Sequence, residues 1–247
     1  MLARIPLIGF LLSAWESFDQ QALRFRASLS QEENAAQVRW IRELLFVAAI
    51  LLALGYSFGD RPFFEQLFGP LVSRTPRLAR YHELLSFSYW SVAKLLGYGV
   101  FPMLHIALRG GRLRDFGLAL GGASAVDETI RLPWARMYLY LLCAILPLVF
   151  AVSFAQSFQQ NYPFYRQASR SFFDFVVWEA EYLSTFVAVE YFFRGYLLFS
   201  LRRYLGSLAL FVSMVPYCLI HVVKPAPEAL GSIFAGLLLG TLALCTG

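Results

Sequence analysis

The chain of 247 residues is poor in charged side chains, which make up 15% of the sequence, against about 25% in ordinary soluble domains. Its three cysteines, Cys143, Cys218 and Cys245, are an odd set scattered through apolar stretches, which excludes a disulfide framework and a zinc knuckle. No basic run is dense enough to follow a phosphate backbone, so the net charge of +5 does not indicate nucleic-acid binding. These shortages argue against a soluble domain and against a nucleic-acid partner.

Hydrophobic residues take the place of the missing charges. They form 58% of the sequence, and Phe (24 residues) and Tyr (13 residues) are especially frequent. So much apolar surface cannot remain in water, which excludes disorder, and abundant aromatic residues are typical of proteins with aromatic belts at the membrane interface. The composition therefore predicts a polytopic membrane protein.

The predicted fold class is all-α, a polytopic transmembrane helical bundle with about six spans. A helix needs roughly 20 residues to cross the hydrocarbon core of a bilayer. Six stretches reach or approach that length: 42–58, 85–108, 137–156, 172–200, 206–223 and 229–245. Residues 1–41 are predicted to form an N-terminal interfacial segment with a short helix at 5–15, and residues 42–247 the transmembrane domain. Further short interfacial helices are expected in the loop 59–84 and at 112–121.

The distribution of basic residues predicts that the N-terminus is cytoplasmic. The side that holds the N-terminus and the loops 109–136 and 201–205 carries twelve Lys and Arg residues, and the opposite side carries seven. Cytoplasmic loops of membrane proteins are enriched in these residues, so the side with twelve is predicted to face the cytoplasm.

The predicted span at 172–200 is unusual because it carries five charged residues. They are Asp174, Glu179, Glu181, Glu190 and Arg194. A charge at the centre of a bilayer costs at least about 2.5–3.5 kcal/mol, so each is a functional candidate. On an α-helix Glu190 and Arg194 can pair at i and i+4, and Glu179 lies on nearly the same face. We therefore predict a polar stripe of these three residues, with Glu181 pointing elsewhere, toward a membrane surface; a purely structural Glu190–Arg194 ion pair is the alternative.

Two other polar residues in predicted spans have a simpler interpretation. The flexible stem of Lys94 can carry its ammonium group toward the membrane surface. His105 lies near the end of its span, where a histidine is usually satisfied by a local partner. We predict that both residues are structural.

His221 closes the span at 206–223, and Pro225 and Pro227 break the helix directly after it. A lone histidine at a helix end is more often a satisfied polar residue than a catalyst. A catalytic role for His221 becomes more plausible when it is considered together with Glu190. A carboxylate can act as general base or acid, and an imidazole can help to activate water or stabilise an oxyanion. One glutamate and one histidine on different helices can thus form a hydrolytic site within the membrane.

Two strings around these residues resemble motifs of the CPBP family, the CAAX proteases and bacteriocin-processing enzymes also called Abi. The string VEYFFRGYLLFSL at 189–201 resembles the first motif, E-E-x-x-x-R often followed by Gly, through Glu190 and Arg194. The second motif, an aromatic residue and a histidine separated by three residues, matches Tyr217 and His221.

The resemblance covers a CPBP-like core at about 161–247. Within it, the pattern His-x-x-Lys-Pro-x-x-Glu contains Lys224 and Glu228 and resembles a bacterial subgroup that carries E-F-F-F-R-G and H-x-x-K-P-x-x-E. The resemblance implies a location in the bacterial inner (plasma) membrane.

The family implies an intramembrane endopeptidase that acts on a membrane-anchored peptide or protein, such as a prenylated CAAX-like sequence or a sorting signal. The resemblance implies that Glu190 and His221 activate the water and that Arg194 holds Glu190. It also makes supporting or further candidates of four residues: Glu179, Tyr217, Lys224 and Glu228. Members have been described as metalloproteases, but a glutamate and a histidine alone do not complete a zinc site, so no metal or other cofactor is expected.

Two departures from the family pattern keep other interpretations open. Val189 replaces the first glutamate of the E-E pair, which the family's prenyl proteases are thought to use as the base, so the role of Glu190 is open and Glu179 is a substitute candidate. A later motif of the family, H-x-x-x-N/D, has no counterpart, so the core is expected to lack its C-terminal end, as a fragment or a shortened homologue. The alternative functions are an inactive CPBP-like scaffold or a maturation or immunity partner and, from the polar stripe alone, a small transporter.

Overall fold

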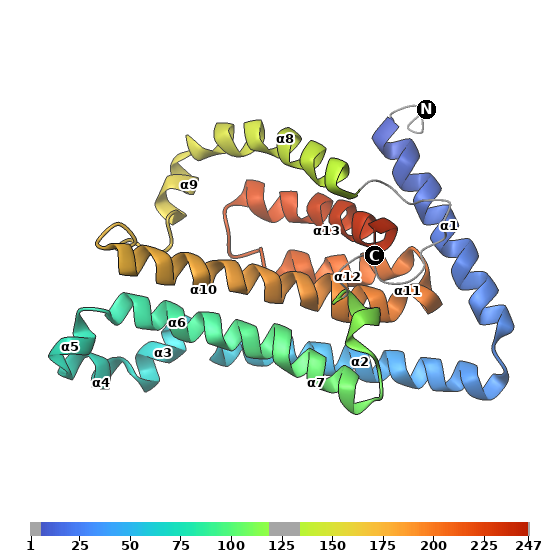
Figure 1. Cartoon of the computed structure of the whole chain (residues 1–247), viewed down its shortest axis with the longest axis horizontal. Coiled ribbons are helices and arrows are strands. Elements are labelled where there is room, and N and C mark those ends of the chain that lie inside the picture. The colour runs from blue at the N-terminus through green and yellow to red at the C-terminus, as the bar shows by residue number, and fades with distance from the viewer. Residues whose placement is uncertain (1–5, 119–133, 247) are drawn as a thin grey trace. The chain divides into compact units, whose positions relative to one another are not determined.

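The computed structural model describes residues 6–118 and 134–246 of the chain (Figure 1). These residues form helices joined by turns, and no strand occurs among them, which confirms the all-α prediction. The chain divides into two compact units: unit 1 comprises Met1–Arg42, Arg112–Asn161 and Phe193–Gly247, and unit 2 comprises Glu43–Gly111 and Tyr162–Phe192. The division into an interfacial segment and a transmembrane domain at residue 42 stays a prediction.

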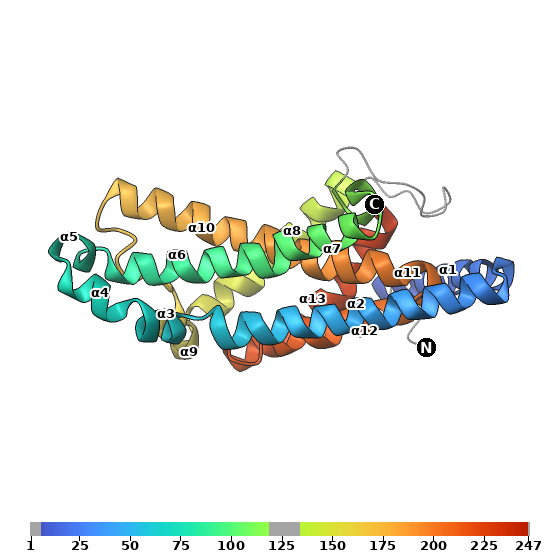
Figure 2. The ribbon, with the colours of Figure 1, turned by 90° about the horizontal axis from the view of Figure 1, so that it is seen from below.

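The helices can be followed in chain order in Figures 1 and 2. They are α1 (Pro6–Ser28), α2 (Gln31–Phe58), α3 (Arg61–Leu67), α4 (Gly69–Arg74), α5 (Pro76–Ala79), α6 (His82–Lys94), the π-helix η2 (Leu95–Val100), α7 (Phe101–Leu108), the 3₁₀-helix η3 (Leu113–Phe116), α8 (Trp134–Ser153), α9 (Gln156–Asn161), α10 (Phe172–Glu190), the π-helix η5 (Tyr191–Leu198), α11 (Phe199–Leu205), α12 (Leu208–Leu219) and α13 (Ala226–Thr246). The short helices α3, α4, α5 and η3 lie where the sequence predicts short helices in the loops.

Three of the predicted spans are confirmed as helical stretches that are long and apolar enough to cross a membrane. They are Gln31–Phe58, His82–Leu108 and Ala226–Thr246. Two more are shorter apolar helices, Tyr138–Ser153 and Leu208–Leu219. The chain is helical throughout 172–200 as well, where α10 carries four acidic residues. The protein is an integral membrane protein, and its many exposed apolar side chains are those that a bilayer would cover.

In unit 1, α1 is longer than the helix predicted at 5–15 and packs against α11 and α13. Ala14, Phe18 and Ala22 recur every four residues, so they form a stripe on one face of α1, and all three are buried. The indole Nε1 of Trp15 donates a hydrogen bond to Thr241 Oγ1 of α13 at 2.9 Å. One face of α1 is therefore covered by protein.

The turn between α11 and α12 depends on a glycine. Gly206 has φ +62°, which side chains rarely tolerate, and a Cβ at this position would lie 2.5 Å from Asp19 Oδ1 of α1. The same carboxylate accepts hydrogen bonds from the main-chain N of Ser207 at 2.8 Å and from its Oγ at 2.9 Å. The glycine thus lets α1 approach closely enough for Asp19 to accept hydrogen bonds from Ser207, just before α12.

Close packing of α12 on α13 uses the Gly236-x-x-x-Gly240 pattern. A Cβ on Gly236 would lie 3.0 Å from Met214 Cγ, and a Cβ on Gly240 would lie 2.9 Å from Leu210 Cδ2. Small residues allow helices in a membrane to approach until their side chains interlock. The two glycines therefore determine how closely α13 approaches α12.

In unit 2, α6 lies alongside α10 (Figures 1 and 2). Their shared core contains four buried residues: Leu84, Phe87, Tyr165 and Trp178. The Tyr165 hydroxyl donates to Asp174 Oδ1 at 2.5 Å, and Arg170 Nε donates to Asp174 Oδ2 at 3.1 Å. Burial and the hydrogen bond to Asp174 raise the pKa of Tyr165 above its ordinary value. Asp174 is thus a satisfied structural carboxylate at the start of α10.

We expect Gly240→Leu to lower the free energy of unfolding by about 1–3 kcal/mol, because the added side chain overpacks the contact between α12 and α13. Unfolding of the purified protein in detergent micelles measures the effect. Gly231→Leu on the same helix is the matched control, since no atom lies within 4 Å of a Cβ built at Gly231. Equal stability of the two variants would contradict the packing role of Gly240.

Candidate functional site

The first motif lies where the helix changes its hydrogen-bonding pattern. α10 ends at Glu190, and the chain continues directly as the π-helix η5, in which Arg194 lies. π-Helical turns are rare and occur frequently at functional sites. The prediction that Arg194 shares a face with Glu179 and Glu190 assumes 3.6 residues per turn. A π turn is wider than an α turn, so this spacing does not apply beyond Glu190.

Glu179 and Glu190 belong to unit 2. Both lie on the uninterrupted α-helix α10, so their separation of eleven residues keeps them on nearly the same face, as predicted. Glu179 is exposed and Glu190 is half-buried. Of the two glutamates, Glu190 is therefore the less exposed.

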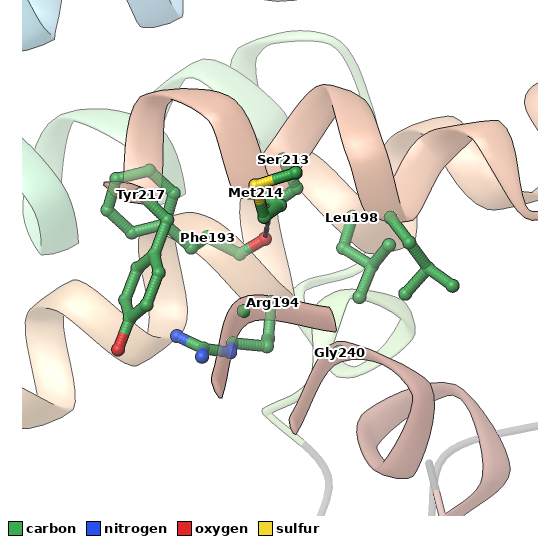
Figure 3. A pocket seen from close by; sticks show the side chains of 9 residues that line it. Phe193, Arg194, Leu198, Ser213, Met214, Tyr217 and Gly240 are labelled. Carbon is green, nitrogen blue, oxygen red and sulfur yellow. Dashed lines mark hydrogen bonds between the residues drawn. The ribbon is translucent and has the colours of Figure 1, made fainter. Parts of the chain in front are cut away.

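In unit 1, Arg194 lies against the aromatic ring of Tyr217 from α12. Its guanidinium carbon is 4.4 Å from the ring centroid, and Figure 3 shows the guanidinium directed toward Tyr217. Both side chains are buried, with exposed fractions of 8% for Arg194 and 9% for Tyr217. A guanidinium over the face of an aromatic ring is attracted by the ring quadrupole, most strongly when water is excluded. The fold therefore brings one residue of each motif together.

His221 follows the last turn of α12 and also contacts Tyr217. The two ring centroids are 4.7 Å apart with an interplanar angle of 49°. The His221 Nδ1 donates a hydrogen bond to the main-chain carbonyl oxygen of Tyr217 at 2.8 Å. A carbonyl oxygen can only accept, so in the neutral ring Nδ1 carries the proton and Nε2 carries the lone pair. Nε2 is thus the nitrogen available as a base.

A small cavity adjoins Arg194 and Tyr217 and has room for about one water molecule. Its wall includes Ser213 of α12, whose Oγ donates to the main-chain carbonyl of Phe193 at 2.8 Å (Figure 3). The bond fastens η5 to α12 at the residue before Arg194. Ser213 is not among the residues that the sequence singles out; a polar residue within an apolar helix was the signal.

Lys224 and Glu228 form an ion pair at i and i+4 across the start of α13, from Nζ to Oε1. Both are half-buried. The helix breaks before the prolines: α12 ends at Leu219 and α13 begins at Ala226, so Pro227 lies in the first turn of the new helix. The pair fastens the segment that follows His221.

Glu181 has a hydrogen-bond partner within the protein, and its location at a membrane surface stays a prediction. Its side chain is half-buried in unit 2, where Ser88 Oγ of α6 donates to Glu181 Oε1 at 2.5 Å. Ser91 Oγ donates to the main-chain carbonyl of Glu181 at 3.0 Å. α6 thus presents serines to α10, which gives this carboxylate a protein partner.

Lys94 and His105 both have local partners in unit 2, as predicted for His105. Lys94 Nζ donates to the Tyr98 hydroxyl at 3.3 Å and lies 4.7 Å from the centroid of that ring. His105 Nε2 is 2.9 Å from Glu43 Oε1, to which Arg109 Nε also donates at 2.7 Å. Both residues thus have partners within unit 2, and their structural role stays a prediction.

The structure thus brings Arg194, Tyr217 and His221 together in unit 1 and pairs Lys224 with Glu228. Within the described ranges, 6–118 and 134–246, no group of three or more His, Cys, Asp and Glu residues could hold a metal ion. The preference for a metal-free mechanism stays a prediction.

A family model described as type II CAAX prenyl endopeptidase, Rce1-like, matches residues 171–247. The match runs from Ser171, the cap of α10, through α13, so it includes both motifs. No curated protein and no solved structure matches the chain. The match confirms the resemblance to CPBP proteins, and the narrower assignment to a bacterial subgroup stays a prediction.

We expect the neutral imidazole of His221 to be protonated at Nδ1, because that nitrogen donates to the Tyr217 carbonyl. The chemical shifts of the ring nitrogens in protein labelled with ¹⁵N-histidine report the tautomer. His221→Gln identifies the resonances among those of His82 and His105. A neutral ring protonated mainly at Nε2 would contradict the geometry.

Proposed function

We propose that this chain, whose residues 171–247 match the Rce1-like family model, is a CPBP-type intramembrane protease that hydrolyses a peptide bond of a membrane-associated peptide or protein. The proposal rests on the family match over the segment that contains both motifs. The geometry in unit 1 supports it, because Tyr217 links Arg194 of the first motif to His221 of the second.

In the proposed reaction Glu190 and His221 act on one water molecule. The water oxygen attacks the carbonyl carbon of the scissile bond as its proton passes to the base, and a tetrahedral oxyanion forms. The oxyanion collapses with cleavage of the C–N bond, and the base returns the proton to the leaving amine. In the neutral ring of His221, Nε2 has the lone pair that can accept a hydrogen bond or the proton.

The proposed role of Arg194 is to hold Glu190 in position with a permanent positive charge. A guanidinium stays protonated in proteins, so it favours the ionised form of a nearby carboxylate. Glu228, fastened by Lys224, would support the segment that carries His221. Glu179 is the substitute base if Glu190 has only a structural role.

The substrate that we propose is anchored in the bilayer, as a prenylated CAAX-like sequence or a sorting signal is. A site on apolar helices is most easily reached by a peptide that the membrane itself delivers. We also propose that the protein lies in a bacterial plasma membrane with its N-terminus cytoplasmic, which the twelve basic residues on that side support.

Glu190→Gln and His221→Ala are each expected to lower hydrolysis by at least about 100-fold, the usual contribution of a general acid or base. The assay uses wild-type protein in liposomes with a panel of prenylated peptides and membrane-anchored peptides. If both residues act on one water, the double variant keeps about the same residual rate as either single variant. Glu16→Gln, at an exposed position of α1, is the control for loss of a carboxylate.

Full activity in both single variants would overturn the proposed roles of Glu190 and His221. Glu179→Gln in the same assay decides between the two glutamates of α10. Loss of activity in Glu179→Gln with activity retained in Glu190→Gln would move the role of base to Glu179.

A catalytically inactive membrane scaffold is the second candidate function, and Val189 favours it. This valine stands where the first glutamate of the E-E motif is found in the family. If wild-type protein cleaves no member of the panel, Val189→Glu is expected to produce cleavage, because it restores the E-E pair. Val189→Gln is the matched control, and equal absence of cleavage in both variants would contradict the idea that Val189 alone silences the site.

A further inference from the structure

We propose that Tyr217 is a positioning residue that fixes the Arg194 guanidinium and the His221 imidazole at the same time. The inference rests on the proposed function, since it concerns the rate of that hydrolysis. All three residues belong to unit 1, so the contacts that carry the inference lie within one compact unit.

The ring of Tyr217 contacts both the Arg194 guanidinium and the His221 imidazole. The Arg194 guanidinium carbon lies 4.4 Å from its centroid, and the His221 ring centroid lies 4.7 Å from it. The interplanar angle of 49° tilts the imidazole over the ring while Nδ1 reaches the Tyr217 carbonyl at 2.8 Å. Side chain and main chain of the same residue therefore determine where His221 lies and which nitrogen carries its proton.

The ring can act in this way because its own position is fixed on two further sides. Phe193 of η5 meets it edge-on, with centroids 5.2 Å apart and an interplanar angle of 78°. On α13, a Cβ at Gly236 would lie 3.3 Å from Tyr217 Cδ1, so the glycine leaves just enough space for the ring. A buried ring with neighbours on η5 and α13 has little freedom to turn.

Loss of the ring would therefore release both side chains at once. The guanidinium would lose its aromatic surface, and the imidazole would lose the neighbour that keeps Nδ1 directed at the carbonyl. The Tyr217 hydroxyl takes no part in these contacts, so phenylalanine should serve nearly as well as tyrosine. Misplacement of reacting groups by a fraction of an ångström slows catalysis more than it weakens binding.

The test compares Tyr217→Leu and Tyr217→Phe with wild-type protein in the peptide assay. We expect Tyr217→Leu to lower kcat about 10-fold or more with KM changed less than about 3-fold, and Tyr217→Phe to recover kcat to within about 3-fold of wild type. Phe199→Leu is the matched control, because Phe199 is also a buried ring in unit 1 under a guanidinium, that of Arg202 at 4.4 Å. Equal loss in Phe199→Leu and Tyr217→Leu, or no rescue by phenylalanine, would overturn the proposal.

A second measurement does not depend on a substrate. In the ¹⁵N spectrum of the neutral imidazole, Tyr217→Leu should convert the Nδ1-protonated form of His221 into a mixture of tautomers, while Tyr217→Phe should leave it unchanged. An unchanged tautomer in Tyr217→Leu overturns the proposal even if wild-type protein hydrolyses peptides. If no protein hydrolyses any peptide, the proposed function fails and the tautomer alone decides on Tyr217.

Tyr217→Met is the second ring-free variant, for use if Tyr217→Leu does not fold. The long, flexible methionine side chain fills irregular space, so it removes the ring while restoring part of its volume. The same expectations apply to it, and a wild-type tautomer in the folded Tyr217→Met protein would again overturn the proposal.

Discussion

A guanidinium buried among apolar helices needs a favourable surface for its charge, since it does not give up its proton and loses hydration on burial. Arg194 is such a group, and the face of Tyr217 is one surface that receives it. The contact joins η5 to α12, and the same ring contacts His221. The ring that supports the arginine of the first motif thus also contacts the histidine of the second motif.

Two features of the helices around Tyr217 allow this contact. The π-helix η5 places Arg194 after a widened turn, and Ser213 of α12 satisfies the Phe193 carbonyl within that turn. On the other side, the glycines of α13 let α12 approach without a side chain between the helices. The Ser213 hydrogen bond satisfies a buried carbonyl, and the glycines leave space for the neighbouring helix. Both therefore favour close packing around the Tyr217 ring.

Other charges of the chain illustrate a different solution. Asp174 accepts hydrogen bonds from Tyr165 and Arg170, and His105 shares Glu43 with a neighbouring arginine. These groups are satisfied within their own unit by residues on adjoining helices or turns. A charge in an apolar helix is therefore not by itself evidence of catalysis, and the chemistry of its partners separates a structural group from a candidate catalyst.

The sequence by itself determined the all-α membrane fold, the break between the last two helices near Pro225, and the two motifs, because these follow from apolar length, proline chemistry and residue type. It could not determine that the α-helical period ends at Glu190 or that Glu181 turns inward to Ser88. Both depend on hydrogen bonds and packing between elements far apart in the chain, which a periodic pattern does not encode. Only the tertiary structure decided that Arg194 lies against the ring that His221 also contacts, since η5 and α12 must meet before the guanidinium can reach Tyr217.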